Sequence, residues 1–431
     1  MPQILPVLEY LVKPMQIGTN LALLHLMWAI ASGAFLSNRG SVHGALATIG
    51  LDKGGIQRGW SVLRYGVWSI EELLLRWNDW VMTETEWQPR KHAQWQAVGL
   101  DITTFWRPKL KGWKERGYHQ LAGRLLPGVA LGVIVRVGEI GQQRIPLLKR
   151  LVRAPEGSTD EKGLQARLLK WTVSGLESEE VAVLDGGFKL ASLQAAKVPR
   201  FLVRMAVNCT LRHNVLPPKN GVRGAKPKYG LYVRPLARKY KENEIAATAP
   251  MRHSTFTHQD VTVKADGWYG LVRSDQKVSK THPTVVIWVF HDPRYKSSLV
   301  VATNLELSAH VAYHLYRDRW PVEQPPLVAK QTLGLQRMFV HAHACVRRLP
   351  ELALFVANVM TIIAATLPAI PTGFWYRQPK KTAGRLSRSL RKVNFSDLTL
   401  TDGRIRKKAS ATDHLPKGNP RYCAQMVSEP A

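Results

Sequence analysis

The chain has 431 residues, of which 45% are hydrophobic, so it is long enough for two or three domains with a large buried core, and its composition excludes a disordered protein. Lysine and arginine number 61 against 31 aspartate and glutamate, which gives a formal charge of +30. This excess favours a polyanionic partner, either nucleic acid or an acidic membrane surface. The three cysteines, Cys209, Cys345 and Cys423, contain no CxxC pair, which argues against a disulfide framework or a zinc ribbon and favours a reducing cytoplasm.

Residues 1–92 are expected to form a helical domain. Apolar stretches such as "LALLHLMWAIASGAFL" have helical spacing, and Ser69 with Glu72 three positions later makes a capping box. Upstream, two short helices broken near residues 50–55 have the outline of a helix-turn-helix, which would make this a DNA-binding domain. A small helical bundle gives the same pattern. The second helix would present Gln57, Arg58 and Arg64.

A mixed α/β core is expected over residues 93–207 and again over residues 283–345. Strand-like stretches such as "AVGLDITTF" and "VAVLDGG" alternate there with a helical "EKGLQARLLKW". Residues 208–282 interrupt the core with "PPKNGVRGAKPKYG", rich in Pro, Gly and Lys, and then with short strand-like pieces. We interpret them as a β-rich insertion with a basic loop. The predicted fold class is therefore α/β, with an N-terminal helical domain.

Residues 346–374 contain an apolar stretch, "LALFVANVMTIIAATLPAI", that is close to the length of a membrane-spanning helix. Asn358, Pro368 and the lack of aromatic belts favour a buried C-terminal helix instead, and no membrane contact is expected. The amino terminus has no basic segment ahead of its apolar residues, which argues against a secretory signal. Residues 375–431 are basic and polar, and we expect a flexible tail that binds nucleic acid.

Three carboxylates stand out. Asp101 follows the apolar run "AVGL" and Asp185 follows "VAVL", at strand ends where side chains are held rigidly at the rim of a sheet. Glu323 is the single glutamate of the basic stretch "YHLYRDRWPVEQPPLVAKQ". Each residue alone is explained as a turn cap or a surface ion-pair partner. Together, in a positively charged protein, they suggest a Mg²⁺ site that acts on phosphate.

The stretch around Glu323 has a second pattern. On a helical wheel Tyr316, Arg319, Glu323 and Lys330 fall within one arc of about 60°. An ordinary solvent-exposed helix has its charged residues on several faces, so their grouping on one face indicates a functional surface. Pro321, Pro325 and Pro326 make one continuous helix doubtful, and we expect one helix to end near Arg319 and another to begin near Pro325.

The spacing of Tyr316, Arg319, Glu323 and Lys330 resembles the Tyr-Arg-Glu-Lys signature of the insertion sequence four (IS-four) superfamily of DDE transposases. The stretches "DIT" at Asp101 and "DGGF" at Asp185 are similar to the first two acidic motifs of that group. The likeness covers roughly residues 95–345.

This resemblance implies a ribonuclease H-like core in which Asp101, Asp185 and Glu323 are catalytic and hold two Mg²⁺ ions, for which Mn²⁺ can substitute. It also implies that Tyr316, Arg319 and Lys330 bind DNA. The expected activity is cut-and-paste transposition by a homodimer on double-stranded DNA, acting on the terminal inverted repeats of its own element and on target DNA in the bacterial cytoplasm, at the nucleoid.

Two alternatives remain: a catalytically inactive DNA-binding relative or repressor, and a ribonuclease H-like nuclease without strand transfer. Trp268 and Trp288 are open to two interpretations, stacking on an unpaired base or packing in the core. The "HAHAC" stretch is a poor metal site, because residues two apart on a helix point to different sides.

Overall fold

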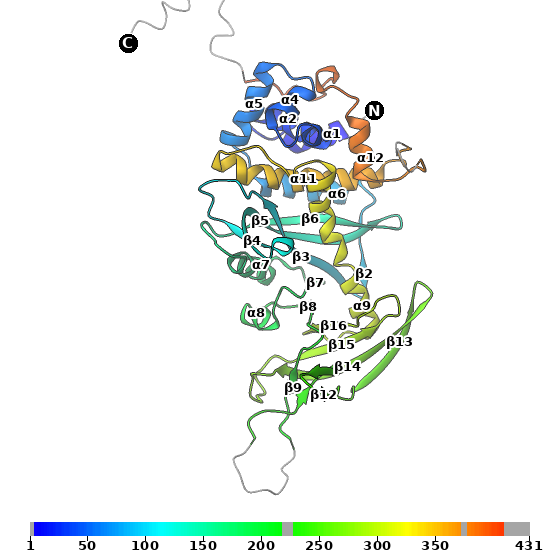
Figure 1. Ribbon diagram of the computed structural model, residues 1–431. Helices are drawn as coiled ribbons and strands as arrows, with labels where there is room; N and C mark the ends of the chain where they lie inside the picture. Colours follow the sequence, from blue (N-terminus) through cyan, green and yellow to red (C-terminus); the bar gives the residue numbers. More distant parts are fainter. Residues whose placement is uncertain (1–3, 218–226, 372–376, 409–431) are drawn as a thin grey trace, which may run out of the picture.

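The computed structural model describes residues 4–217, 227–371 and 377–408. Figure 1 shows an elongated molecule with a layer of helices at one end, a sheet in the middle, and further strands at the other end. Most of the basic loop expected in the insertion, and residues 409–431 of the expected tail, lie outside the described residues. The mixed α/β class predicted from the sequence is confirmed.

The helical layer precedes the sheet in sequence. As expected, a helix pair is broken near residue 50, and the Ser69 hydroxyl accepts a hydrogen bond from the Glu72 amide at 3.1 Å, which confirms the capping box. The chain leaves this layer earlier than residue 92, because residues 88–89 and 91–92 pair with strands of the sheet. The helices are α1 (Ile4–Val12), α2 (Thr19–Ala31), α3 (Ala34–Ser37), α4 (Val42–Thr48), α5 (Lys53–Tyr65) and α6 (Ile70–Glu84).

Five strands form the centre of the sheet, in the order β6-β5-β3-β7-β8. β5 is antiparallel to β3 and to β6, while β3, β7 and β8 are parallel. Helix α7 (Lys162–Gly175) leads into β7, and α8 (Leu190–Ala195) leads into β8. The short strands β1 (Gln88–Pro89), β2 (Lys91–His92) and β4 (Arg116–His119) lie alongside. The central strands are β3 (Trp95–Trp106), β5 (Arg124–Ile140), β6 (Gln143–Arg153), β7 (Glu180–Leu184) and β8 (Phe201–Arg204).

Beyond β8 the same sheet continues through β16 and β15, from the expected second part of the core, and then through β14, β9 and β10, from the expected insertion. Trp268 and Trp288 are 1% and 0% exposed in these strands, so the packing interpretation holds and the base-stacking one is wrong. The strands are β9 (Leu211–His213), β10 (Tyr232–Val233), β13 (Arg252–His258), β14 (Val261–Arg273), β15 (Val285–His291) and β16 (Leu299–Thr303), with β11 (Arg238–Tyr240) and β12 (Asn243–Ile245) as a separate pair.

Helix α11 (His343–Thr366) lies between the helical layer and the sheet (Figure 1). It is long and apolar enough to cross a membrane, and most of it is buried inside the protein. Its apolar residues therefore cover one face of the sheet.

The expectation of a flexible tail from residue 375 is wrong for the described residues 377–408. Helix α12 (Ala383–Leu390) packs against α11, and Leu386, Leu390, Phe395 and Ile405 are buried. The Phe395 amide donates to the Ile49 carbonyl at 2.8 Å, which ties the segment to the helical layer. A few apolar anchors at suitable spacing outweigh the basic composition here, because each buried side chain stabilises by about 2 kcal/mol.

Asn358 explains the polar residue in the apolar stretch of α11. It is 0% exposed, and its side-chain oxygen accepts from Trp77 Nε1 of α6 at 2.9 Å and from the Leu148 amide of β6 at 3.0 Å. Its amide nitrogen donates to the Pro146 carbonyl at 2.7 Å. One buried side chain thus joins the helical layer, α11 and the edge of the sheet.

We expect Asn358→Leu to lower the free energy of unfolding by about 3 kcal/mol or more, because three buried polar groups lose their partner. Urea unfolding measures this. The control is Thr361→Ala, one turn further along α11, whose hydroxyl bonds only to the Ala357 carbonyl of its own helix at 2.7 Å and which should cost less than about 1 kcal/mol. Equal losses in the two variants would contradict the joining role of Asn358.

Candidate active site

The pairing of β3 with β7 brings the two aspartates together. These strands are parallel, with Gly99 opposite Val183, so continuing the register by two residues puts Asp185 beside Asp101. Asp185 follows the last residue of β7, and its Oδ1 accepts from the Gly187 amide at 2.9 Å. The two carboxylates, 84 positions apart in the sequence, become neighbours at the carboxyl end of β7.

One face of β3 meets the segment that carries Glu323. Residues 99, 101 and 103 point to the same side, because side chains alternate along a strand. A Cβ on Gly99 would lie 3.1 Å from Val322 Cβ, so the missing side chain is what lets the segment approach the strand. The Thr103 hydroxyl accepts a hydrogen bond from Lys330 Nζ at 2.7 Å. Asp101 lies between these two contacts.

The segment itself is a series of short helical turns. Helix α9 (Ala309–Arg317) is followed by a 3₁₀ turn η2 (Trp320–Glu323), by α10 (Gln324–Leu327) and by a π-helical turn η3 (Val328–Thr332). The expected break and restart are confirmed to within two residues. The prolines occupy first-turn positions, where no amide donor is needed. The residues of the predicted helical face therefore come from separate turns.

Asp318, which the sequence analysis did not single out, anchors the start of this segment. Its side chain is 2% exposed and contacts Arg90 at 3.1 Å, His92 at 2.6 Å and Arg144 at 3.4 Å. These three partners come from beside β1 and from β2 and β6, so the residue just before Arg319 is fixed to the sheet. These partners are far from Asp318 in the sequence, so no local sequence pattern predicts the contacts.

Arg319 holds Glu323. Its Nη2 donates to Glu323 Oε1 at 2.9 Å, with the arginine side chain 10% exposed and the glutamate side chain 46% exposed. Tyr316 is buried beside them, and burial raises the pKa of its hydroxyl, while Arg319 and Arg204 oppose that rise. Arg204, at the end of β8, is a further cation that the sequence analysis missed.

The electrostatics of Asp101 link all three acids. Burial, helped by the charges of Asp185 and Glu323, raises the pKa of Asp101 to about 6, while the Ile102 amide and Arg319 oppose the rise. The nearby Lys330 ammonium is also partly desolvated, and burial lowers its pKa to about 8. The expected site residues thus form one charged cluster, with the acids repelling one another.

This cluster has the donor chemistry that Mg²⁺ prefers, because its acids supply hard carboxylate oxygens and their mutual repulsion favours a cation among them. Within the ranges that the structure describes, no three His, Cys, Asp or Glu side chains stand close enough to hold a metal ion. One oxygen of Glu323 accepts its hydrogen bond from Arg319.

Outside the cluster, the "HAHAC" stretch has a structural role. His343 packs against the ring of Trp113, with centroids 4.9 Å apart, and Cys345 is 0% exposed in the core. A comparison with models of protein families found no match to the chain, and a comparison with curated proteins found none either. The case for a function therefore rests on the residues themselves.

We expect Asp101→Asn to stabilise the metal-free protein above pH 6. A carboxyl whose pKa is raised on folding, here to about 6, weakens the fold progressively from about pH 4 upward, because the unfolded chain ionises first. Asparagine removes that penalty, so the free energy of unfolding should rise by about 3 kcal/mol at pH 8 and hardly change at pH 4. Urea unfolding in the presence of a chelator measures both values.

The control is Glu306→Gln, an exposed acid before α9, which should have no effect at either pH. A loss of stability in Asp101→Asn at pH 8 would show that its carboxylate is held by compensating contacts instead.

Proposed function

We propose that the protein is a DDE-type transposase that cleaves DNA strands and transfers them in a Mg²⁺-dependent reaction. The observation that carries this proposal is geometric: the β3–β7 register puts Asp101 beside Asp185, and the segment that carries Glu323 packs on the same face of β3. Structural ion pairs alone do not require three acids to approach one another in a chain with twice as many bases.

We further propose that the core is ribonuclease H-like. Three antiparallel strands, β6, β5 and β3, are followed by two strands parallel to β3, each reached through a helix, in the order β6-β5-β3-β7-β8. Asp101 lies on the central strand of this order and Asp185 follows the neighbouring one. This supports the family assignment that the sequence motifs suggested.

In this mechanism Asp101, Asp185 and Glu323 would hold two Mg²⁺ ions, which supply charge stabilisation for in-line displacement at a phosphodiester. Water attacks first and releases a 3′-hydroxyl, and that hydroxyl then attacks a phosphodiester of the target strand. Arg319 orients Glu323 through their hydrogen bond, and the second oxygen of Glu323 would be the one available to a metal.

Two further residues have positioning roles. Lys330 is oriented by Thr103 and keeps its positive charge beside Asp101 below about pH 8, which suits a contact to a DNA phosphate. Tyr316 is only 6% exposed, so it supports Arg319 from inside and offers the DNA little surface.

DNA as substrate is supported by the charge of +30 and by the helix pair α4 and α5, in which Gln57 and Arg64 are exposed. Recognition of terminal inverted repeats by this layer, and a dimer that brings two ends together, are parts of the same proposal. Asn358 ties that layer firmly to the core, so a bound end would be held in a fixed relation to the carboxylates.

We expect Glu323→Gln to reduce Mg²⁺-dependent cleavage at least 100-fold, because the substitution keeps the shape and removes a ligand charge. DNA affinity without metal should stay equal or rise, since a negative charge is lost. The assay uses a duplex that carries the terminal repeats flanking the gene, and it follows both nicking and joining to a plasmid.

Asp101→Asn and Asp185→Asn should be equally inactive, and Glu306→Gln should cleave normally. If Glu323 is only a surface partner of Arg319, its removal changes stability by about 1 kcal/mol or less and leaves cleavage intact. Wild-type rates in any of the three acid variants would overturn the proposed site. Nicking without joining would point to a nuclease.

A further inference from the structure

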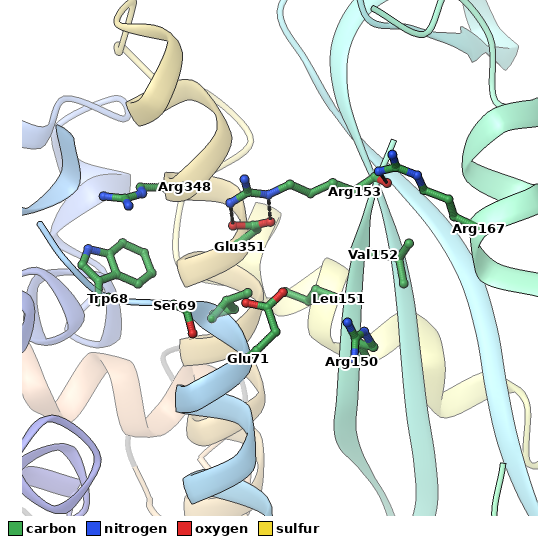
Figure 2. A pocket seen from close by; sticks show the side chains of 11 residues that line it. Trp68, Ser69, Glu71, Arg150, Leu151, Val152, Arg153, Arg167, Arg348 and Glu351 are labelled. Carbon is green, nitrogen blue, oxygen red and sulfur yellow. Dashed lines mark hydrogen bonds and ion pairs between the residues drawn. The ribbon is translucent and has the colours of Figure 1, made fainter. Parts of the chain in front are cut away.

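A second charged site lies between the helical layer and the edge of the sheet. A cavity of about 510 Å³ is bordered by α6, β6, α7 and α11 (Figure 2). Its polar lining is dominated by arginines. They are Arg150 and Arg153 of β6, Arg167 of α7 and Arg348 of α11.

Two acids also line the cavity, and one of them has both carboxylate oxygens in an ion pair. Glu351 is 2% exposed and pairs with Arg153 through both of its carboxylate oxygens, as the dashed lines in Figure 2 show. Glu71, in the first turn of α6, is the other acid. Four arginines against two acids leave the lining with an excess of two positive charges.

Two of the other three arginines are held in place by neutral groups. Arg348 donates to the Gly66 carbonyl at 2.9 Å and lies over the Trp68 ring at 5.0 Å, and Arg167 donates to the Arg153 carbonyl at 3.2 Å. Among the described residues, no acid forms an ion pair with Arg150, Arg167 or Arg348. A guanidinium has five donors, so most of theirs are left for a ligand.

We propose that this cavity binds a phosphate group of the nucleic-acid backbone. Several guanidinium groups that line one cavity from different elements fit the multiple oxygens of a phosphate, which accept forked hydrogen bonds. The fixed positions of Arg167 and Arg348 reduce the ordering needed on binding. Lysines on an ordinary basic surface offer neither forked hydrogen bonds nor fixed side-chain positions.

The cavity and the carboxylates are carried by neighbouring strands of one sheet. Leu151, which lines it, is opposite Val133 of β5, and Val133 is opposite Asp101 of β3. Two strand spacings amount to about 10 Å, which is less than the width of a major groove, about 12 Å. The inference rests on the proposed function for the identity of the ligand, but its test requires no cleavage.

The test combines Arg150→Gln with Arg167→Gln, because both side chains are exposed and can change without disturbing the core. Both changes are made in the Glu323→Gln protein, and binding to a 30-base-pair duplex of arbitrary sequence is measured as a function of salt. Loss of one phosphate contact should make the slope of log K against log salt shallower by about 0.9. We expect the affinity to fall at least tenfold at 0.15 M salt.

The matched control is Lys170→Gln with Lys189→Gln, which removes the same charge from exposed positions on α7 and just before α8. It should change the affinity less than twofold. Equal losses in both pairs would overturn the proposal, because bulk charge would then explain the binding. An unchanged slope in the arginine pair would overturn it as well.

Inorganic phosphate separates the two sources of the ligand. The Tm of the Glu323→Gln protein and of the arginine pair is compared in phosphate and in chloride at equal ionic strength. A phosphate-dependent rise that the arginine pair abolishes, together with unchanged DNA binding, would identify a site for free phosphate and overturn the nucleic-acid assignment. If the arginine pair weakens DNA binding as expected but none of the acid variants affects cleavage, the proposed function is wrong and the phosphate-binding site is still supported.

Discussion

The parallel pairing of β3 with β7 is the constraint on which the candidate site depends. A shift of one residue in this register would turn Asp101 to the opposite face of the sheet, toward α7 and away from Glu323. The register is fixed by burial on both faces, since Val98 and Ala182 pack on the α7 side while Ala97 and Val181 pack on the α9 side. The position of the acids is therefore a by-product of core packing.

The segment that brings Glu323 to this strand depends on a second constraint, close approach. Gly99 lets Val322 lie against β3, and Asp318 fixes the chain one residue before Arg319. Short turns with proline near their start then replace a regular helix, so Val322 and Lys330 contact β3 on either side of Asp101. A longer side chain at position 99 would separate the third acid from the first two.

Much of this arrangement could be predicted from the sequence, because it follows from local signals. Aspartates after apolar strand runs, the spacing around Glu323 and the interruption by prolines each depend on a few neighbouring residues. The same holds for the capping residue Ser69 and for the burial of the apolar helix that contains Asn358.

The rest depends on contacts between residues far apart in the chain. Asp318 and Arg204 have partners that no local pattern reveals, and the basic composition after residue 375 hides the few apolar residues that anchor α12. Trp268 and Trp288 are equally suited to a core and to a base, and the strand pairing decides between these roles. The extent of the sheet could not be predicted either, because the sequence of a single strand does not reveal which other strand it pairs with.

The continuous sheet has a consequence for how such a protein can evolve. β8 is covered by β16 on the side away from β7, and β16 is reached only through β15 and β14. The segment between the second and third acids is therefore no detachable module. A lineage that lost β14, β15 and β16 would leave the edge of β8 unpaired, beside the strand that leads to Asp185, and an unpaired edge can pair with another chain. Shortening is tolerated only from the far end, at β9 and β10, where the sheet already stops.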